Sequence, residues 1–569
     1  MKKTFKRLGA VLLAAFMLLS TTICALADDN TQTSTPTSSK TITLNVSNVA
    51  DGDTVSAYKL VWYNDDGNGY TFDTGFESYI QSQSDIGNKT AEQYLASSDA
   101  TGVNELLEGY ATECNNTANT TYTLPAVSAS GTATGGNASL TLGAGYYLLL
   151  TKTDSKNSNI YTPLSAFVKV DGEGLVVYAG SNDKALKAES DESYKVAAKS
   201  ENGPTIDKKT NATKGSGKAT WKETAAAGVG DIVRFYVEVN IPAYNNVSAL
   251  NLTVNDTLTN LKYKEGSVKV YKNRPDPKGS NDSNTEIQNA IKNSENVVVQ
   301  DYAVNNGTGT QKLKFELDYQ KIMGDAAAQA KTVYVYYEAI MQKESVAEKT
   351  NSGENVATLT YSNAAKPDSE YTTDKKKTDV YNYYLKLNKV KDDTEVALKG
   401  AKFSVYMSPT DNNPIPFVKE TDTDGTAYYR PAVGNETPTE TVLEANFRIR
   451  GLDANTYYLE EVETPKGYTK PSGRFAIAMT SKFNENGTHT GKLDSTKSSM
   501  TSVNDADKNL FVSGVNAEVL HQFDATIKNF STPNLPTTGG TGTVLLSIGG
   551  VVLMAAGAYL LFFRKKKEN

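Results

Sequence analysis

The stretch Thr456-Tyr457-Tyr458-Leu459-Glu460-Glu461 carries the pattern that decides how this chain folds. In a β-strand successive side chains point to opposite faces, so Tyr457, Leu459 and Glu461 share one face. Aromatic and apolar residues in this alternation are typical of a strand that covers a core. The stretch therefore predicts a buried strand with one carboxyl group on its apolar face.

Similar strand patterns recur along most of the chain, bounded by Gly, Asn, Asp or Pro. They include Thr41–Val46, Tyr146–Leu150, Ile232–Val239, Thr332–Tyr337 and Phe403–Tyr406. Helical patterns are confined to insertions, chiefly Phe76–Tyr110, with a weaker one at Glu286–Lys292. Short strands at regular spacing predict an all-β protein of three tandem immunoglobulin-like β-sandwich domains, with a helical insertion in the first.

Two polar junctions separate the strand-rich parts of the chain, at residues 185–203 and 366–379. They predict domains at 40–190, 200–380 and 381–530. The length of 569 residues agrees with three domains, because a domain typically has roughly 150 residues.

The N-terminus has the features of a secretory signal peptide. A start with four basic residues precedes an apolar stretch at 8–19, and Ala25-Leu26-Ala27 offers small residues for cleavage. We therefore expect residues 1–27 to be removed after Ala27. Residues 28–39 are rich in Ser and Thr and predict a disordered leader.

The C-terminal segment, 531–569, combines three elements in order. Leu535-Pro536-Thr537-Thr538-Gly539 precedes an apolar run at 544–563 and a basic tail. The run is long enough for a transmembrane helix, and the basic tail favours the cytoplasmic side. The pentapeptide resembles the Leu-Pro-x-Thr-Gly sorting signal of Gram-positive surface proteins. That resemblance implies that a sortase cysteine attacks the Thr538 carbonyl, releases the chain from Gly539 onward and holds the rest as a thioester.

Charge and cysteine content exclude several classes of protein. The chain has a formal net charge of -7, and both ends expected to be removed are basic, so the mature chain is more acidic still. Such a chain is a poor candidate for binding nucleic acid. Cys24 lies in the signal peptide, so the mature chain keeps only Cys114 and has no intramolecular disulfide.

Fragments that resemble enzyme motifs do not complete them. Gly215-Ser216-Gly217-Lys218 lacks the other residues of a phosphate-binding loop. Asp422-Thr423-Asp424-Gly425 resembles the start of a calcium loop, but the later ligands are missing, so we expect a hairpin turn. His489 and His521 have no companions at metal-ligand spacing. We predict no cofactor, no metal site and no enzyme activity on an external substrate.

The third segment resembles the B-type collagen-adhesin domain of Gram-positive pilins over residues 384–530. The resemblance rests on the first strand Leu385-Lys386-Leu387-Asn388-Lys389, on a Glu-x-x-x-Pro-x-Gly-Tyr signature beginning at Glu461, and on the final strand Thr526-Ile527-Lys528-Asn529. It implies an isopeptide bond between Lys389 and Asn529, assisted by Glu461. Burial favours the neutral forms of both lysine and glutamate, so the amine can attack the amide while the acid moves protons.

The middle segment resembles the A-type collagen-adhesin domain of major pilins. Lys208 lies on the apolar face of its first strand, Asp256 follows Leu252 and Val254 on one face, and Asn363 ends its last expected strand. The resemblance implies a bond from Lys208 to Asn363 with Asp256 as the acid. Lys209 is an alternative to Lys208, because the two are adjacent.

The first segment serves as an internal control. Gly145-Tyr146-Tyr147-Leu148-Leu149-Leu150 repeats the pattern around Glu461, with Leu150 in place of the carboxyl group. Its first strand places Ile42, Leu44 and Val46 on one face and has no lysine there. We expect no isopeptide bond here. The segment resembles the N-terminal domain of major pilins.

Polymerisation of such pilins needs an acceptor lysine. The family has it in a Val-Tyr-Pro-Lys context just before the second domain, and Val196-Ala197-Ala198-Lys199 stands there in this chain. The Tyr-Pro pair is missing, so Lys195, Lys187 and Lys184 compete with Lys199.

Together these resemblances imply the major subunit of a pilus on the surface of a Gram-positive bacterium, secreted and anchored to the cell wall. Its partners would be a polymerising class C sortase, a housekeeping sortase, peptidoglycan and further copies of the chain joined head to tail, with minor pilins and host surface ligands in addition. A head-to-tail contact propagates as a filament. The alternative is a monomeric wall-anchored adhesin, or a minor pilin, that binds a host ligand.

Overall fold

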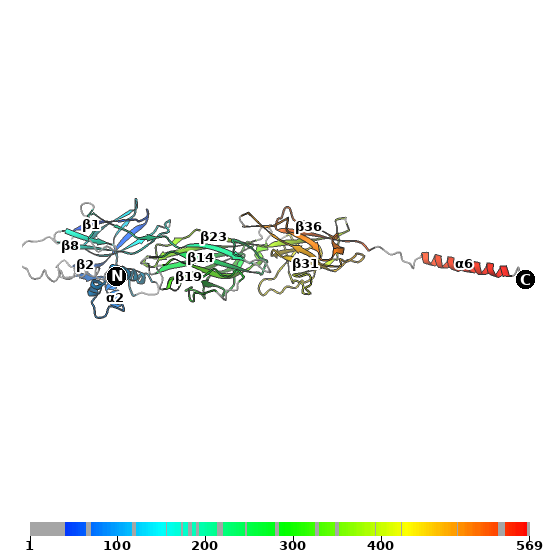
Figure 1. Ribbon diagram of the computed structural model, residues 1–569, viewed down its shortest axis with the longest axis horizontal. Coiled ribbons are helices and arrows are strands. Elements are labelled where there is room, and N and C mark those ends of the chain that lie inside the picture. The colour runs from blue at the N-terminus through cyan, green and yellow to red at the C-terminus, as the bar shows by residue number, and fades with distance from the viewer. Residues whose placement is uncertain are drawn as a thin grey trace, which may run out of the picture. The chain divides into compact units, whose positions relative to one another are not determined.

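The computed structural model describes residues 40–565, apart from 64–69, 99, 117–120, 155, 172–173, 180–184, 189–192, 213–219, 245–246, 248, 279–283, 325–328, 347–351, 393, 423, 486–487 and 533–540. Strands dominate the described part of the chain, and most of them form three consecutive pairs of sheets (Figure 1). The chain divides into two compact units, one of residues 1–382 with 483–491, the other of 383–482 with 492–569. The prediction of an all-β chain with tandem sandwiches is confirmed.

The first sandwich occupies the N-terminal part of unit one. Its strands are β1 (Thr41–Ser47), β2 (Thr54–Tyr63), β3 (Tyr70–Phe72), β4 (Val127–Thr132), β5 (Asn137–Gly143), β6 (Gly145–Lys152), β7 (Ile160–Tyr161), β8 (Leu164–Asp171), β9 (Gly174–Ala179), β10 (Ser193–Ala197) and β11 (Ser200–Glu201). One sheet has the order β10-β1-β5, and the other has β3-β2-β6-β8-β9 with β4 beside β2. Because β10 pairs in parallel with β1, the first sandwich extends past residue 190 into the expected junction.

The core of the first sandwich follows the predicted alternation. Ile42, Leu44 and Val46 of β1 are all buried between the two sheets, whereas Leu150 of β6 is buried on the other face of its sheet, in the cluster with the helices. The helical insertion is also confirmed, as α2 (Thr74–Gln81), α3 (Ala91–Ser97) and α4 (Ala100–Cys114). Thr90 caps α3 through a capping box, which satisfies backbone N–H groups at the start of the helix. The helices share a second apolar cluster with β2 and β6.

The middle sandwich completes unit one. Its elements are β12 (Thr205–Asn211), β13 (Thr224–Ala226), β14 (Ile232–Ile241), β15 (Leu250–Thr259), β16 (Leu261–Tyr263), β17 (Lys269–Tyr271), β18 (Val298–Asn305), β19 (Thr308–Asp318), α5 (Tyr319–Met323), β20 (Lys331–Met341), η5 (Lys343–Val346), β21 (Ser352–Asn363), β22 (Tyr371–Thr372) and β23 (Lys376–Tyr381). One sheet has the order β12-β14-β20-β16, with β17 beside β20. The facing sheet has the order β13-β23-β21-β15-β19-β18, with β22 beside β21.

Two expectations for the middle segment need correction. The helix expected at Glu286–Lys292 is absent from the described residues there: Glu286 forms an isolated bridge with Tyr271, and Ile291 forms one with Leu317. Its helix-like spacing arises because Ile287 and Ile291 each anchor a loop to the core. The polar stretch 366–379 is also not a linker between domains. It contains β22 and most of β23, and both strands pair with β21 of the middle sandwich.

The third sandwich makes up most of unit two. The elements from Tyr383 to Asn529 are β24 (Tyr383–Lys391), β25 (Val396–Ala397), β26 (Lys402–Tyr406), β27 (Val418–Thr421), β28 (Ala427–Arg430), β29 (Leu443–Glu444), β30 (Arg448–Leu452), β31 (Thr456–Glu463), β32 (Phe475–Ala478), β33 (Ser481–Phe483), β34 (His489–Leu493), β35 (Ser499–Ser502), η6 (Asp505–Asp507), β36 (Phe511–Val515) and β37 (Gln522–Asn529). One sheet has the order β27-β28-β30-β24-β37-β36, with β25 beside β24, and the facing sheet has β29-β26-β31-β32-β35. The first and last strands, β24 and β37, are parallel neighbours. The hairpin turn predicted at Asp422 is confirmed, because Thr421 pairs with Ala427 across it.

The C-terminal helix α6 spans Thr541–Lys565 and contains the apolar run. Within the part of the chain that the structure describes, no helix meets the length and apolarity needed to cross a membrane. The span expected at 544–563 stays a prediction.

Inside unit one, the end of β21 is tied to the first sandwich. Tyr361 Oη donates to the Ser158 carbonyl at 2.8 Å, and Asn363 Nδ2 donates to the Tyr161 carbonyl at 2.9 Å. Gly203 lies beside these contacts, and a Cβ atom there would overlap both Tyr361 Oη and the Ser158 carbonyl. These contacts fix β7, the strand that pairs with β11.

Gly203→Ala should destabilise unit one by about 1–3 kcal/mol, because overpacking at a filled contact forces neighbouring groups apart. Thermal unfolding of the mature chain measures the change. The control is Gly514→Ala on β36, where an added Cβ has no neighbour within 4 Å. Equal unfolding temperatures for Gly203→Ala and the wild type would contradict the packing described here.

Candidate functional site

The third sandwich brings Lys389, Glu461 and Asn529 together in its core. Lys389 comes from β24 and Asn529 ends the neighbouring parallel strand β37, where Ile527 is the register partner of Lys389. Glu461 comes from β31 in the facing sheet. The exposed fractions of Lys389, Glu461 and Asn529 are 0%, 1% and 1%. The expected grouping of these three side chains is therefore present.

The contacts within this group leave two oxygen atoms without a donor. Asn529 Nδ2 donates to Glu461 Oε1 at 2.7 Å, and Lys389 Nζ donates to the Ile527 carbonyl at 3.2 Å. The Lys389 Nζ atom lies 3.9 Å from Glu461 Oε2. Glu461 Oε2 and Asn529 Oδ1 have no hydrogen-bond partner among the described residues. A proton on Glu461 would turn its side chain into a hydrogen-bond donor within this group.

Burial shifts both titratable groups toward their neutral forms. It lowers the pKa of Lys389 to about 8, although the nearby Glu461 acts in the opposite direction. It also raises the pKa of Glu461, against the opposing effects of Lys389 and Asn529. A charged group in a low-dielectric core is costly, so burial brings the two pKa values closer together and makes the neutral amine and the protonated acid more accessible than they are in water.

The middle sandwich holds a second buried group around Lys208. Lys208 and Asp256 are each 1% exposed, and Lys208 Nζ lies 2.6 Å from Asp256 Oδ2. Burial lowers the pKa of Lys208, which Asp256 opposes. Lys208 lies on β12 and Asp256 on β15, so the two come from facing sheets.

The alternative Lys209 is excluded from this group by its direction. Period-two alternation places it on the opposite face of β12 from Lys208. Its ammonium group instead pairs with Asp207 and Glu223 on the partly exposed surface. Lys208 is therefore the lysine that enters the core.

Asn363 does not reach this group, and Asn355 takes its place. Asp256 is opposite Ala357 on β21, whereas Asn363 lies six residues further, about 20 Å along the strand, opposite Leu250. Asn355 is one diagonal step from Asp256 and is fully buried. The expectation for Asn363 was wrong because Asn355 and Asn363 share one face of β21, and alternation cannot separate them.

Tyr337 of β20 is a further member of this group that the sequence reasoning missed. Its Oη accepts hydrogen bonds from Lys208 Nζ at 2.7 Å and from Asn355 Nδ2 at 2.8 Å, and it donates to Asp256 Oδ2. The sequence signal was present, because Val333, Val335 and Tyr337 share the buried face of one predicted strand.

Lys199 lies between β10 and β11 with an exposed side chain. Its backbone is held, since Thr162 N donates to the Lys199 carbonyl at 3.1 Å. Lys195 on β10 and Lys187 are also exposed, and Lys184 lies outside the described residues. Asn363 contributes here, because it binds Tyr161 of β7, which pairs with Ser200 of β11.

The sorting pentapeptide 535–539 and the cleavage site at Ala27 lie outside the described residues. The chain leading toward the pentapeptide is held by the signature loop after Glu461. Tyr468 forms a bridge with Ser531, and Thr532 N donates to the Gly467 carbonyl at 2.9 Å. The chain is thus held to the third sandwich as far as Thr532.

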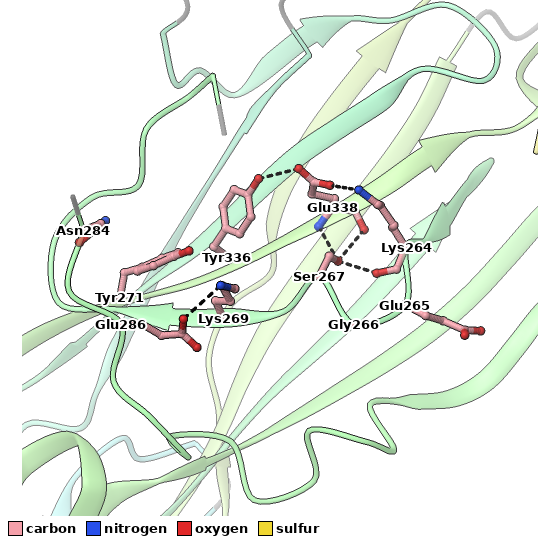
Figure 2. A pocket seen from close by; sticks show the side chains of 10 residues that line it. All are labelled: Lys264, Glu265, Gly266, Ser267, Lys269, Tyr271, Asn284, Glu286, Tyr336 and Glu338. Carbon is pink, nitrogen blue, oxygen red and sulfur yellow. Dashed lines mark hydrogen bonds and ion pairs between the residues drawn. The ribbon is translucent and has the colours of Figure 1, made fainter. Parts of the chain in front are cut away.

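A surface hollow of about 480 Å³ lies over β17, β20 and the loop that joins β16 to β17 in the middle sandwich (Figure 2). Its charged groups are largely paired with each other. Lys264 Nζ lies 2.7 Å from Glu338 Oε2, Tyr336 Oη donates to Glu338, and Lys269 pairs with Glu286. In the described residues no cluster of His, Cys, Asp or Glu has the arrangement of a metal site.

Comparison with known families finds two matches. Residues 384–490 match a prealbumin-like fold domain, and residues 531–569 match the LPXTG cell wall anchor motif. A sequence comparison with curated proteins finds no match. The fold and the anchor motif define this chain as an all-β surface protein, anchored to the cell wall of a Gram-positive bacterium.

Solved structures similar to this chain include three backbone pilins. The T6 backbone pilin of serotype M6 Streptococcus pyogenes is 16% identical with a TM-score of 0.43, covering 89% of this chain and 100% of that one. The major pilin SpaD of Corynebacterium diphtheriae is 14% identical with a TM-score of 0.36, covering 87% and 98%. The major pilin SpaA of the same species, described as having a modular assembly with stabilising isopeptide bonds, is 12% identical with a TM-score of 0.38, covering 86% and 100%.

Proposed function

We propose that this chain is the backbone subunit of a sortase-assembled pilus on the cell wall. One observation carries the proposal. The two sandwiches between Lys199 and the sorting motif each bury a lysine, an acid and an asparagine on strands distant in sequence, whereas the first strand of the first sandwich has no lysine and buries Ile42, Leu44 and Val46. Load in a fibre joined from Thr538 to Lys199 would cross the two reinforced sandwiches and bypass the first.

The buried group of the third sandwich supports an isopeptide bond between Lys389 and Asn529. Neutral Lys389 attacks the Asn529 amide carbon, Glu461 donates a proton toward the carbonyl oxygen, and ammonia leaves. The bond closes a loop of about 140 residues, which removes roughly 5 kcal/mol of unfolded-state entropy on the disulfide model. It also removes the ionisable amine of Lys389 from the core, because the product amide is neutral, and leaves Glu461 as the remaining titratable group.

In the middle sandwich the bond would join Lys208 to Asn355, with Asp256 as the acid. This assignment replaces the expected Asn363 and rests on the shared contact of Lys208 and Asn355 with Tyr337. The bond would link the first strand of the sandwich to a late one, so load entering at β12 would bypass most of the intervening strands.

Assembly would proceed through the sorting motif. A polymerising class C sortase would cut after Thr538 and transfer it to Lys199 of the next subunit, and a housekeeping sortase would attach the finished fibre to peptidoglycan. Lys199 suits this role because its exposed side chain projects from a backbone that Thr162 and β11 hold in place. Minor pilins and host ligands would be further partners.

The mature chain, 28–538, should weigh less than its sequence by two ammonia molecules. Asn355→Ala should lose only one ammonia molecule, and so should Asn529→Ala, because each change removes the carbonyl that the amine attacks. Intact mass spectrometry measures this, and tryptic peptides locate each cross-link. Asn363→Ala is the matched control and should keep both losses. A loss that persists in Asn355→Ala would refute the new assignment.

The Lys389–Asn529 bond should form fastest over a limited pH range. Above about pH 8 Lys389 is already neutral, so a further rise in pH only removes the Glu461 proton. Below the raised pKa of Glu461, a further fall in pH only protonates Lys389. The unfolded, unbonded chain can be refolded at a series of pH values and its mass followed over time. A rate that continues to rise well above pH 8 would contradict a role for protonated Glu461.

In cells with their native sortases, the wild type should give a high-mass ladder that resists boiling in detergent. Lys199→Ala should collapse the ladder to monomer and leave wall attachment through Thr538 intact, since only the acceptor is lost. Lys195→Ala is the control and should leave the ladder unchanged. If the ladder persists in Lys199→Ala, another lysine is the acceptor. If the wild type gives no ladder, the chain is better described as a monomeric adhesin.

A further inference from the structure

We propose that Tyr337 is a catalytic residue of the middle sandwich, which delivers a proton to the departing nitrogen of Asn355. The inference rests on the proposed Lys208–Asn355 bond and adds a residue to it. Tyr337 Oη contacts both nitrogen atoms of the reaction, the attacking Lys208 Nζ at 2.7 Å and the departing Asn355 Nδ2 at 2.8 Å.

The two sandwiches differ in how the acid reaches the asparagine. In the third, Glu461 Oε1 accepts directly from Asn529 Nδ2 at 2.7 Å. In the middle sandwich the acid is the shorter aspartate, and the side chain of Asp256 contacts Lys208 and Tyr337 but not Asn355 among the described hydrogen bonds. The Tyr337 hydroxyl bridges the gap that the missing methylene leaves.

The surroundings of Tyr337 hold its hydroxyl in place and in its protonated form. The ring stacks on Phe235 with centroids 5.6 Å apart and packs against Phe315 at 5.2 Å. Burial and the adjacent Asp256 raise the pKa of Tyr337 well above its ordinary value. The hydroxyl therefore still carries its proton when the reaction begins.

The reaction can be written with every proton accounted for. Lys208 first passes a proton to Asp256, and the neutral amine then attacks Asn355 Cγ while the carbonyl electron pair moves to Oδ1. Tyr337 gives its hydroxyl proton to Nδ2 and takes the proton from Asp256 Oδ2. The Cγ–Nδ2 bond breaks, the carbonyl re-forms and ammonia leaves. The extra proton on the new amide nitrogen returns to Asp256, and Tyr337 ends unchanged.

Tyr337→Phe keeps the ring and removes only the hydroxyl. We expect the Lys208–Asn355 bond to form about 10²–10⁴-fold more slowly in this variant, the range for losing a positioned acid or base. The mature chain is refolded from its unbonded state, and tryptic peptides are weighed over time. The Lys389–Asn529 bond in the same molecule reports on folding and should form at the wild-type rate.

Tyr263→Phe is the matched control. Tyr263 packs on the ring of Tyr337 at 6.4 Å, but its hydroxyl accepts from Val268 N and lies outside the group. This variant should form both bonds at the wild-type rate. A difluorinated tyrosine at position 337 tests the chemistry with only a small change in the size of the ring. Its more acidic hydroxyl should change the rate of the middle bond, whereas the same substitution at 263 should not.

The outcomes separate this inference from the proposed function. If the wild type forms the Lys208–Asn355 bond and Tyr337→Phe forms it equally fast, the role of Tyr337 is refuted and the bond stands. If Tyr337→Phe fails to fold, an unchanged rate with difluorotyrosine refutes the role in the same way. If the wild type forms no such bond, the middle assignment of the proposed function fails, and this inference with it.

Discussion

The burial of a lysine beside a carboxyl group is the constraint on which the two downstream sandwiches depend. A lone charge in such a core is costly, and even a paired one must repay the loss of its hydration. The low pKa of Lys389 and the raised pKa of Glu461 show the response, a shift toward neutral partners. A neutral amine and a protonated acid are also the forms that the proposed isopeptide reaction needs. The burial that disfavours charge in the core therefore also favours that reaction.

The sandwich architecture brings these groups together from distant parts of the chain. In the third sandwich the parallel pairing of β24 and β37 sets Lys389 near Asn529, and β31 brings Glu461 from the facing sheet. In the middle sandwich Lys208 and Tyr337 come from one sheet and Asp256 and Asn355 from the other. In the third sandwich the glutamate contacts the asparagine directly, whereas in the middle one the hydroxyl of Tyr337 lies between the aspartate and the asparagine.

Asn363 has a structural role that bears on assembly. It ties the end of β21 to Tyr161 of β7, and β7 pairs with the strand that follows Lys199. The side chain first expected to form a covalent bond instead helps to hold the backbone beside the proposed acceptor. Within unit one, residues of both the first and the middle sandwich thus help to hold the backbone next to Lys199 in place.

Local patterns left Lys208 and Lys209 as alternatives, but they predicted the β class, the helical insertion, the sorting motif and the inward faces of Lys389 and Glu461. All of these depend on local alternation or composition, which a single chain segment carries. The folded chain was needed to show that Asn355, not Asn363, meets Lys208, and that Tyr337 stands between them. Both asparagines satisfy the same two-residue period, and the choice between them depends on register. The packing of whole sheets sets that register, because a strand finds its partner among residues far away in the chain.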